Sequence, residues 1–179
     1  MVPIDPVRRH GAIVATAVAL PVTVLVALAA NRASPSHPVP TAAPAALGPV
    51  TVAPPPSSAA AAHGCPAVIS RLPVVLDGRH SRPAVPASPY VAAWGEPPIV
   101  LRCGVPRPPA FVQTSELSEV NGVQWLPERQ PAGVRWTVVD REVYVEVLIP
   151  AGATNTPVVD LSAAISQALP ARPPQPGPR

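Results

Sequence analysis

Two cysteines are the residues of this chain with the clearest chemistry. Cys65 and Cys103 are its only thiols. A lone cysteine pair in one small domain outside the cytoplasm most often forms a disulfide, so we predict a bridge between them. A zinc site would need further ligands, and the nearby His63 and His80 have no recognised ligand spacing. A redox dithiol would favour the C-x-x-C motif, which is absent. Both remain alternatives to a structural disulfide.

Catalytic motifs are scarce in the sequence. The chain has no G-x-S-x-G nucleophile elbow, no H-E-x-x-H motif and no glycine-rich phosphate loop. It also has no lysine, which excludes a lysine nucleophile. Asp140 and Glu142 form a carboxylate pair that could act as acid and base, but beside Arg141 in a hairpin turn they are typical of solvated charges. We therefore predict no catalytic residues, no metal and no cofactor, and favour a non-enzymatic role.

Large aromatic and charged side chains are the candidates for binding a partner. Tryptophans such as Trp94 and Trp125 offer wide apolar surfaces, although they more often belong to a core. Arg102 is charged yet lies within an apolar run. If it is buried, it needs an acid such as Asp140 or Glu119, and a solvent-facing position is the alternative. The candidate binding residues are Trp94, Arg102, Trp125 and Tyr144.

The stretch from Gly11 to Ala30 carries no charge and follows Arg8 and Arg9. At about 1.5 Å of rise per residue, a helix of this length covers roughly 30 Å, the thickness of the hydrocarbon core of a bilayer. The pattern predicts a single transmembrane anchor over residues 11–30, with residues 1–10 in the cytoplasm and the remaining chain outside. Cleavage after the small residues 27–29 is the alternative, and it would release a secreted protein.

Proline-rich segments flank one predicted domain. Residues 31–64 and 171–179 lack a hydrophobic period, which predicts a disordered Pro/Ala/Ser linker and a disordered tail around a domain at 65–170. The formal charge of +3 arises at the ends, because eight arginines meet nine acidic residues between positions 65 and 170. No basic stripe interleaved with aromatic residues is present, so we predict that the domain binds no nucleic acid.

Within the domain the patterns alternate between helix and strand. Helices are predicted at residues 65–72, at 88–95 after the N-cap Ser88, and from Thr156, where apolar residues recur at helical spacing. An inner strand is predicted at 99–103, and hairpins at Asn121-Gly122 and at 140–142. In the strand 143–149 the odd-numbered residues should face the core. The prediction is an α+β fold with a small, mainly antiparallel sheet and three short helices.

Several of these motifs resemble one known family. They include Cys65-Pro66, the run Ile99-Val100-Leu101-Arg102-Cys103-Gly104, Asn121-Gly122 and Asp140-Arg141. Together they look like the actinobacterial family known as domain of unknown function 3515, and the run ending at Gly104 is the most specific part. The resemblance implies an envelope protein with one N-terminal span or signal, and it supplies no catalytic residues.

The anchor, the linker and the expected disulfide predict a membrane-anchored extracytoplasmic binding module of the cell envelope. Its expected contacts are the lipid bilayer, through residues 11–30, and a cell-wall component or envelope protein. The alternative is an envelope hydrolase or transferase with a carboxylate-based site, which spacing along the sequence does not reveal.

Overall fold

The computed structural model of the chain describes residues 47–178. The predicted anchor at 11–30 lies outside the described residues, as does the first part of the predicted linker. Within residues 47–178, no helix has the length and apolar character that a membrane crossing requires.

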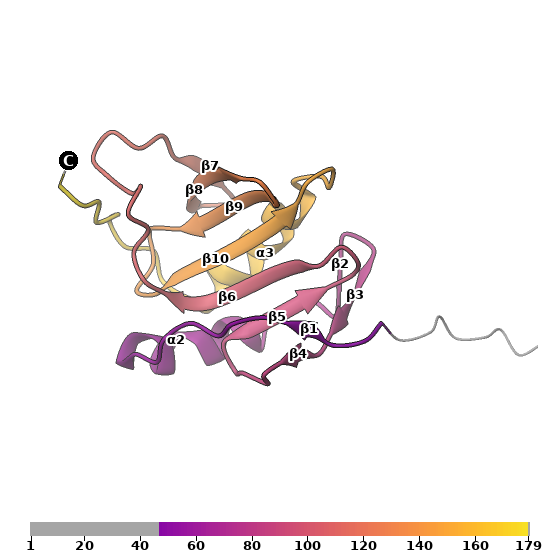
Figure 1. Ribbon diagram of the computed structural model, residues 1–179. Coiled ribbons are helices and arrows are strands. Elements are labelled where there is room, and N and C mark those ends of the chain that lie inside the picture. The colour runs from indigo at the N-terminus through magenta and orange to yellow at the C-terminus, as the bar shows by residue number, and fades with distance from the viewer. Residues whose placement is uncertain (1–46, 179) are drawn as a thin grey trace, which may run out of the picture. The chain divides into compact units, whose positions relative to one another are not determined.

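The described residues form one eight-stranded antiparallel sheet, a separate pair of parallel strands and two helices (Figure 1). β6 (Ile99–Val105) and β10 (Tyr144–Pro150) are central, which confirms the predicted inner strand at 99–103. Beyond β10 follow β9 (Gly133–Val138), β8 (Val123–Gln130) and β7 (Ser118–Val120). Beyond β6 follow β5 (Val91–Trp94), β3 (Arg79–Arg82) and β2 (Val75–Leu76). The parallel pair is β1 (Val50–Thr51) with β4 (Ala84–Val85).

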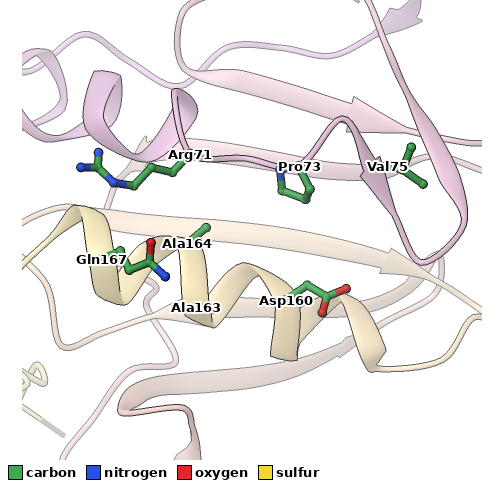
Figure 2. A pocket seen from close by; sticks show the side chains of 7 residues that line it. All are labelled: Arg71, Pro73, Val75, Asp160, Ala163, Ala164 and Gln167. Carbon is green, nitrogen blue, oxygen red and sulfur yellow. The ribbon is translucent and has the colours of Figure 1, made fainter.

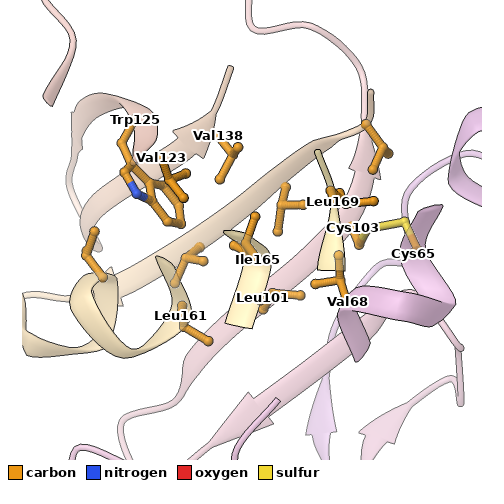
Figure 3. Packing of buried hydrophobic residues seen from close by; sticks show 14 of the residues in the cluster. Cys65, Val68, Leu101, Cys103, Val123, Trp125, Val138, Leu161, Ile165 and Leu169 are labelled. Carbon is orange, nitrogen blue, oxygen red and sulfur yellow. A yellow bond between two sulfur atoms is a disulfide. The ribbon is translucent and has the colours of Figure 1, made fainter. Parts of the chain in front are cut away.

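The main hydrophobic core lies between one face of this sheet and the helices α2 (Ala59–Ile69) and α3 (Thr156–Ala168). In β10 the predicted alternation is confirmed, because Val145, Val147 and Ile149 are buried while their neighbours are partly exposed. The apolar residues of α3 that recur at helical spacing are buried as predicted. Figure 3 shows Leu161 and Ile165 from α3, the C-cap residue Leu169 and Val68 from α2 packed in one cluster with Leu101, Val123, Trp125 and Val138 from the sheet.

The first helix begins at Ala59, so its predicted start at Cys65 is wrong. Alanine has the highest helix propensity, and four alanines follow the N-cap Ser58, whose Oγ accepts a hydrogen bond of 3.1 Å from the Ala61 amide. Pro66 therefore lies inside the helix rather than at its first position. Packing stabilises this extension, because Ala61, Gly64 and Cys65 are all buried.

The predicted helix at 88–95 is wrong, and the described residues contain two helices rather than three. Ser88 Oγ accepts a hydrogen bond from the Tyr90 amide, which closes a local turn instead of capping a helix. Residues 91–94 then form β5, which pairs in register with residues 99–102 of β6. A helix of this length has little stability by itself. Pairing with β6 instead gives the segment backbone hydrogen bonds to a neighbouring strand and buries Trp94.

The predicted disulfide between Cys65 and Cys103 is present, with an S–S distance of 2.09 Å. It joins α2 to the central strand β6, and both cysteines are fully buried. Within residues 47–178, no cluster of histidine, cysteine or carboxylate side chains is suited to hold a metal ion.

Both predicted hairpins are formed, but the second has a longer connection, residues 139–143, than the predicted turn at 140–142. Asn121 and Gly122 have φ values of 51° and 69° and join β7 to β8, as expected of a turn that needs positive φ at both positions. β9 and β10 form the second hairpin across residues 139–143.

The folded unit extends beyond the predicted limits of 65–170 on both sides. On the N-terminal side, residues 50–51 pair with β4 and residues 59–64 belong to α2. On the C-terminal side, the Arg172 amide donates a hydrogen bond of 2.8 Å to the Asp140 carbonyl, and the Gly177 amide donates one of 2.9 Å to the Phe111 carbonyl. The described parts of the predicted linker and tail therefore pack against the domain.

Candidate functional site

The face of the sheet turned away from α2 and α3 is called the open face here. Its side chains alternate with the core residues along β6, β8, β9 and β10, and they include Arg102, Tyr144 and Glu146. A second apolar cluster of Phe111, Leu126 and Val139, with Leu117 and Tyr144 packed against it, covers one end of this face. The segment after β6 therefore folds over part of the sheet and leaves the neighbouring part accessible.

Four charged residues of alternating sign cross the open face from strand to strand. Arg102 on β6 lies directly opposite Glu146 on β10, and its Nε and Nη2 donate to Glu146 Oε1 at 3.0 and 2.7 Å. Arg135 Nε on β9 lies 3.3 Å from Glu146 Oε2, and Glu128 on β8 is the register partner of Arg135. Only 12% of the Glu146 side chain is exposed, so two guanidinium groups enclose this carboxylate.

The expected partner of Arg102 is therefore corrected. The sequence suggests Asp140 or Glu119, whereas the acid in the structure is Glu146. Register explains the difference, since only the pairing of β6 with β10 decides which acid lies opposite Arg102. The alternation along residues 143–149 already placed Glu146 on the outer face, but no local pattern shows that β6 is its neighbour.

Gly104 introduces a bulge that shapes this face. The β6–β10 register shifts between the pairs Tyr144–Val105 and Val145–Cys103, so β6 carries one extra residue at Gly104. Gly104 has a φ of +93°, and a Cβ added there would lie 2.6 Å from the Cβ of Ala61 on α2. The close approach of α2 thus requires glycine, and the extra residue turns Val105 toward the same face as Arg102.

The residues after the bulge form one wall of a cleft of about 340 Å³. Three arginines and two glutamates reach this cleft, so its charged lining has a formal charge of +1. The remaining wall is apolar. The lining residues are Arg102, Val105, Pro106, Arg107, Pro108, Pro109, Glu128, Arg135 and Glu146.

Among the three arginines of this cleft, Arg107 is the one that has no acid partner within residues 47–178. No carboxylate of the described residues lies within salt-bridge distance of its guanidinium, which packs against the backbone of Gly177 in the C-terminal tail. The charge of Arg107 also acts on Tyr144, the first residue of β10. Burial raises the pKa of the Tyr144 phenol above its ordinary value, and the positive charge of Arg107 opposes that rise.

A comparison with known protein families gives a match, and the matched region contains every residue that lines the cleft. The model of the family described as "Protein of unknown function (DUF3515)" matches residues 14–174. The chain belongs to the DUF3515 family. No curated protein and no solved structure matches it.

The DUF3515 fold separates the four candidate binding residues onto two faces of the sheet. Arg102 and Tyr144 lie on the open face, whereas Trp94 and Trp125 are in the core, 1% and 0% exposed. The Trp94 indole donates to the Pro73 carbonyl at 2.8 Å, and the Trp125 indole donates to Ser162 Oγ at 2.9 Å. Neither tryptophan therefore offers a surface to a partner, and both stabilise the core.

The carboxylate pair at the second hairpin of the DUF3515 domain is not a solvated pair. Asp140 and Arg141 have side chains only 6% and 2% exposed and form an ion pair with an N–O distance of 2.6 Å. Arg141 also donates to the Gly122 carbonyl, which ties the second hairpin turn to the first. Glu142 instead pairs with Arg172 at 2.9 Å. The two acids thus have separate structural partners and do not converge on a site.

A second groove, of about 380 Å³, lies between α3 and the segment that follows α2 (Figure 2). Ala163 and Ala164 of α3 are among its lining residues, and its charged residues Arg71 and Asp160 lie toward opposite ends. Arg71 Nη1 donates to the Ala67 carbonyl near the end of α2. Because no charged groups converge here, the cleft on the open face is the better candidate site of this DUF3515 domain.

Proposed function

We propose that this DUF3515 protein is a membrane-tethered, extracytoplasmic binding module of the cell envelope. The uncharged stretch 11–30, preceded by Arg8 and Arg9, supports a single span with a cytoplasmic N-terminus. If the stretch were cleaved as a signal, the same module would be secreted. The two paired cysteines fit an oxidising compartment. Arginine without any lysine is typical of GC-rich genomes and supports an actinobacterial source.

The arginine-lined cleft of the open face carries the binding part of this proposal. A binding site is typically a concave region with a few converging polar groups between apolar walls. The cleft has this composition, because arginine side chains from β6, β9 and the 106–109 segment meet between valine and proline side chains. The partner would be a cell-wall component or an envelope protein.

An envelope hydrolase or transferase is the second candidate, because Glu128 and Glu146 line the same cleft. A carboxylate-based reaction needs one group to donate and one to accept a proton. Glu146 has both oxygens beside guanidinium groups, Oε1 bonded to Arg102 and Oε2 3.3 Å from Arg135 Nε. Only Glu128 is then available for proton transfer, so the geometry favours binding.

Retention on envelope material tests the binding module. The full-length protein in detergent is incubated at high concentration with washed cell-wall fragments and with envelope extracts, and the retained fraction is measured. We expect retention that an Arg107→Ala variant largely loses and an Arg129→Ala variant keeps, because Arg129 is exposed and outside the cleft. No retention, or equal retention by both variants, would contradict the proposal. Release of soluble fragments that stops in a Glu128→Gln variant would favour the enzyme instead.

Cell fractionation tests the location separately. We expect the intact chain in the membrane fraction, with protease added outside the cell removing the domain, and with Cys65 and Cys103 unreactive to thiol reagents until reduced and unfolded. Recovery of the intact chain from soluble cytosol with both thiols free would contradict a membrane-tethered protein.

A further inference from the structure

We infer that the cleft on the open face binds an acid group, a carboxylate or a phosphate, and that Arg107 is its primary contact. This inference names the ligand chemistry of the proposed binding module and rests on that proposal. It follows from a surplus of donors over acceptors, from the position of Arg107, and from the competing role of Glu146.

The cleft holds more hydrogen-bond donors than its acids can satisfy. A guanidinium carries a fork of N–H groups and accepts nothing, so each arginine needs several acceptors. Among the described residues, Arg102 uses Nε and Nη2 on a single glutamate oxygen. The buried Nε of Arg135 and the buried Oε2 of Glu128 each make no hydrogen bond, so the one acceptor left over does not serve the arginine donors. Arg107 has no carboxylate partner in residues 47–178. The missing element is an acceptor-rich, negatively charged group, which guanidinium binds in a bidentate manner.

Arg107 is held in place before any ligand arrives. Its guanidinium lies against Gly177, where an added Cβ would be only 3.1 Å from the Cζ and Nη atoms. Gly177 is itself fixed, because its amide donates to the Phe111 carbonyl and it forms a bridge with Val112. Prolines on both sides of Arg107 further restrict the backbone. A side chain positioned in this way loses little entropy when it binds.

Glu146 acts within the cleft as an internal competitor of the ligand. Its carboxylate lies between Arg102 and Arg135 and neutralises part of their charge. A ligand acid at Arg107 therefore experiences a cleft whose positive potential is reduced by Glu146 and Glu128. Removing the charge of Glu146 should strengthen binding of an acid, although it deletes an ion pair from the fold.

The apolar wall adds a second requirement. Val105, Pro106, Pro108 and Pro109 line the cleft next to the arginines, so a small apolar group attached to the acid can be buried there. The volume of about 340 Å³ suits a short acidic terminus rather than a polymer chain. Acylated amino acids and small phosphate esters both meet this description.

Titration with defined acids tests the inference. Full-length protein in detergent is titrated with N-acetylalanine and with glycerol 3-phosphate while backbone NMR shifts of residues 102–109 are followed, and N-acetylalanine amide and glycerol serve as neutral controls. We expect saturable shifts with at least one acid and none with its neutral control. The tighter acid distinguishes a carboxylate from a phosphate source.

Three variants decide whether the arginines act as proposed. Arg107→Ala should weaken acid binding about tenfold, the effect of one charged hydrogen-bonding contact. Arg129→Ala removes the same charge from an exposed site outside the cleft and should leave binding within about twofold. Glu146→Gln should strengthen binding several-fold, whereas a glutamate that merely shapes the cleft would weaken binding when replaced.

Saturable binding that Arg107→Ala leaves intact, or no binding of either acid, would overturn the inference. Thermal unfolding of each variant checks that a loss of binding does not reflect a loss of fold. Retention on envelope material without binding of either acid would overturn the acid-group inference and leave the binding module standing.

Discussion

Three consecutive residues, Arg102, Cys103 and Gly104, satisfy three different structural requirements. Arg102 points to the open face and pairs with Glu146, while Cys103 points to the core and bonds Cys65 on α2. Gly104 allows α2 to approach the strand and is itself the extra residue of the bulge. The most specific motif of the resemblance therefore links the disulfide, the helix contact and the candidate site within one strand.

A first prediction concerns Gly104. Gly104→Ala should lower the free energy of unfolding by about 3 kcal/mol, because it combines an unfavourable positive φ with a collision against Ala61. Gly152→Ala is the matched control, since Gly152 has a φ of +81° and open space around it. The control should lose about 1 kcal/mol from φ strain alone. Urea unfolding measures both, and equal losses would show that helix contact does not require glycine at position 104.

A second prediction concerns the pKa of Tyr144. Burial raises the pKa of this phenol in the folded state and Arg107 lowers it, so Arg107→Ala should raise the pKa further. The folded pKa lies above the unfolded value of about 10, so the neutral phenol stabilises the fold below that pH. This contribution disappears as the pH rises through the folded pKa. Absorbance titration near 295 nm in a Tyr90→Phe background measures the shift, and an unchanged pKa in Arg107→Ala would contradict the assigned proximity.

At the scale of elements, the segment 88–95 shows how tertiary contacts override local signals. Ser88 and Pro89 form a good helix start, and Gly95 a good helix end. The segment is nevertheless the strand β5, because β6 offers a complete ladder of backbone partners and a buried place for Trp94. Patterns that extend over more residues predicted the structure correctly. The helical spacing of apolar residues from Thr156 and the alternation along 143–149 are both confirmed, by α3 and β10.

A third prediction concerns the link between α2 and β6. The Cys65→Ala/Cys103→Ala double variant should lose about 2–4 kcal/mol of unfolding free energy, because the bond constrains a loop of 38 residues in the unfolded chain. Chemical denaturation measures the loss. The reduced wild-type protein keeps both sulfur atoms in the core without the bond, and therefore separates the cross-link from packing. A reduced protein as stable as the oxidised one would show that the cross-link contributes nothing.

At the scale of the whole folded unit, the two faces of the sheet have different roles. Both helices and the main apolar cluster lie on one face, which accounts for most of the buried side chains. The open face carries the four charged residues Arg102, Glu146, Arg135 and Glu128, and the cleft that they line. In the described part of the C-terminal tail, residues 171–178, Arg172 and Gly177 make hydrogen bonds to the rest of the domain, and Gly177 lies beside the cleft residue Arg107.

A fourth prediction concerns this tail. Deleting residues 171–179 should lower the unfolding free energy by about 1–2 kcal/mol through the loss of its hydrogen bonds. It should also weaken acid binding, because Arg107 loses the Gly177 backbone that it packs against. Arg172→Ala is the control, since it removes only the ion pair with Glu142 and leaves Gly177 attached. Thermal unfolding and the acid titration measure both effects, and a deletion that changes neither would show that the tail is a passive extension.

The sequence alone determined the features that depend on neighbours in the chain. The Asn121-Gly122 turn, the alternation of residues 143–149, the helical spacing from Thr156 and the pairing of the chain's two cysteines follow from local geometry or from simple elimination. Only the tertiary structure decided that Arg102 meets Glu146, that Arg141 is buried with Asp140, and that Gly177 supports Arg107. Each of these contacts joins residues whose proximity depends on strand register, on a bulge or on tail packing. The local sequence determines which face of the sheet a side chain occupies, because residues alternate along a strand. The order and register of the strands determine which residues it contacts.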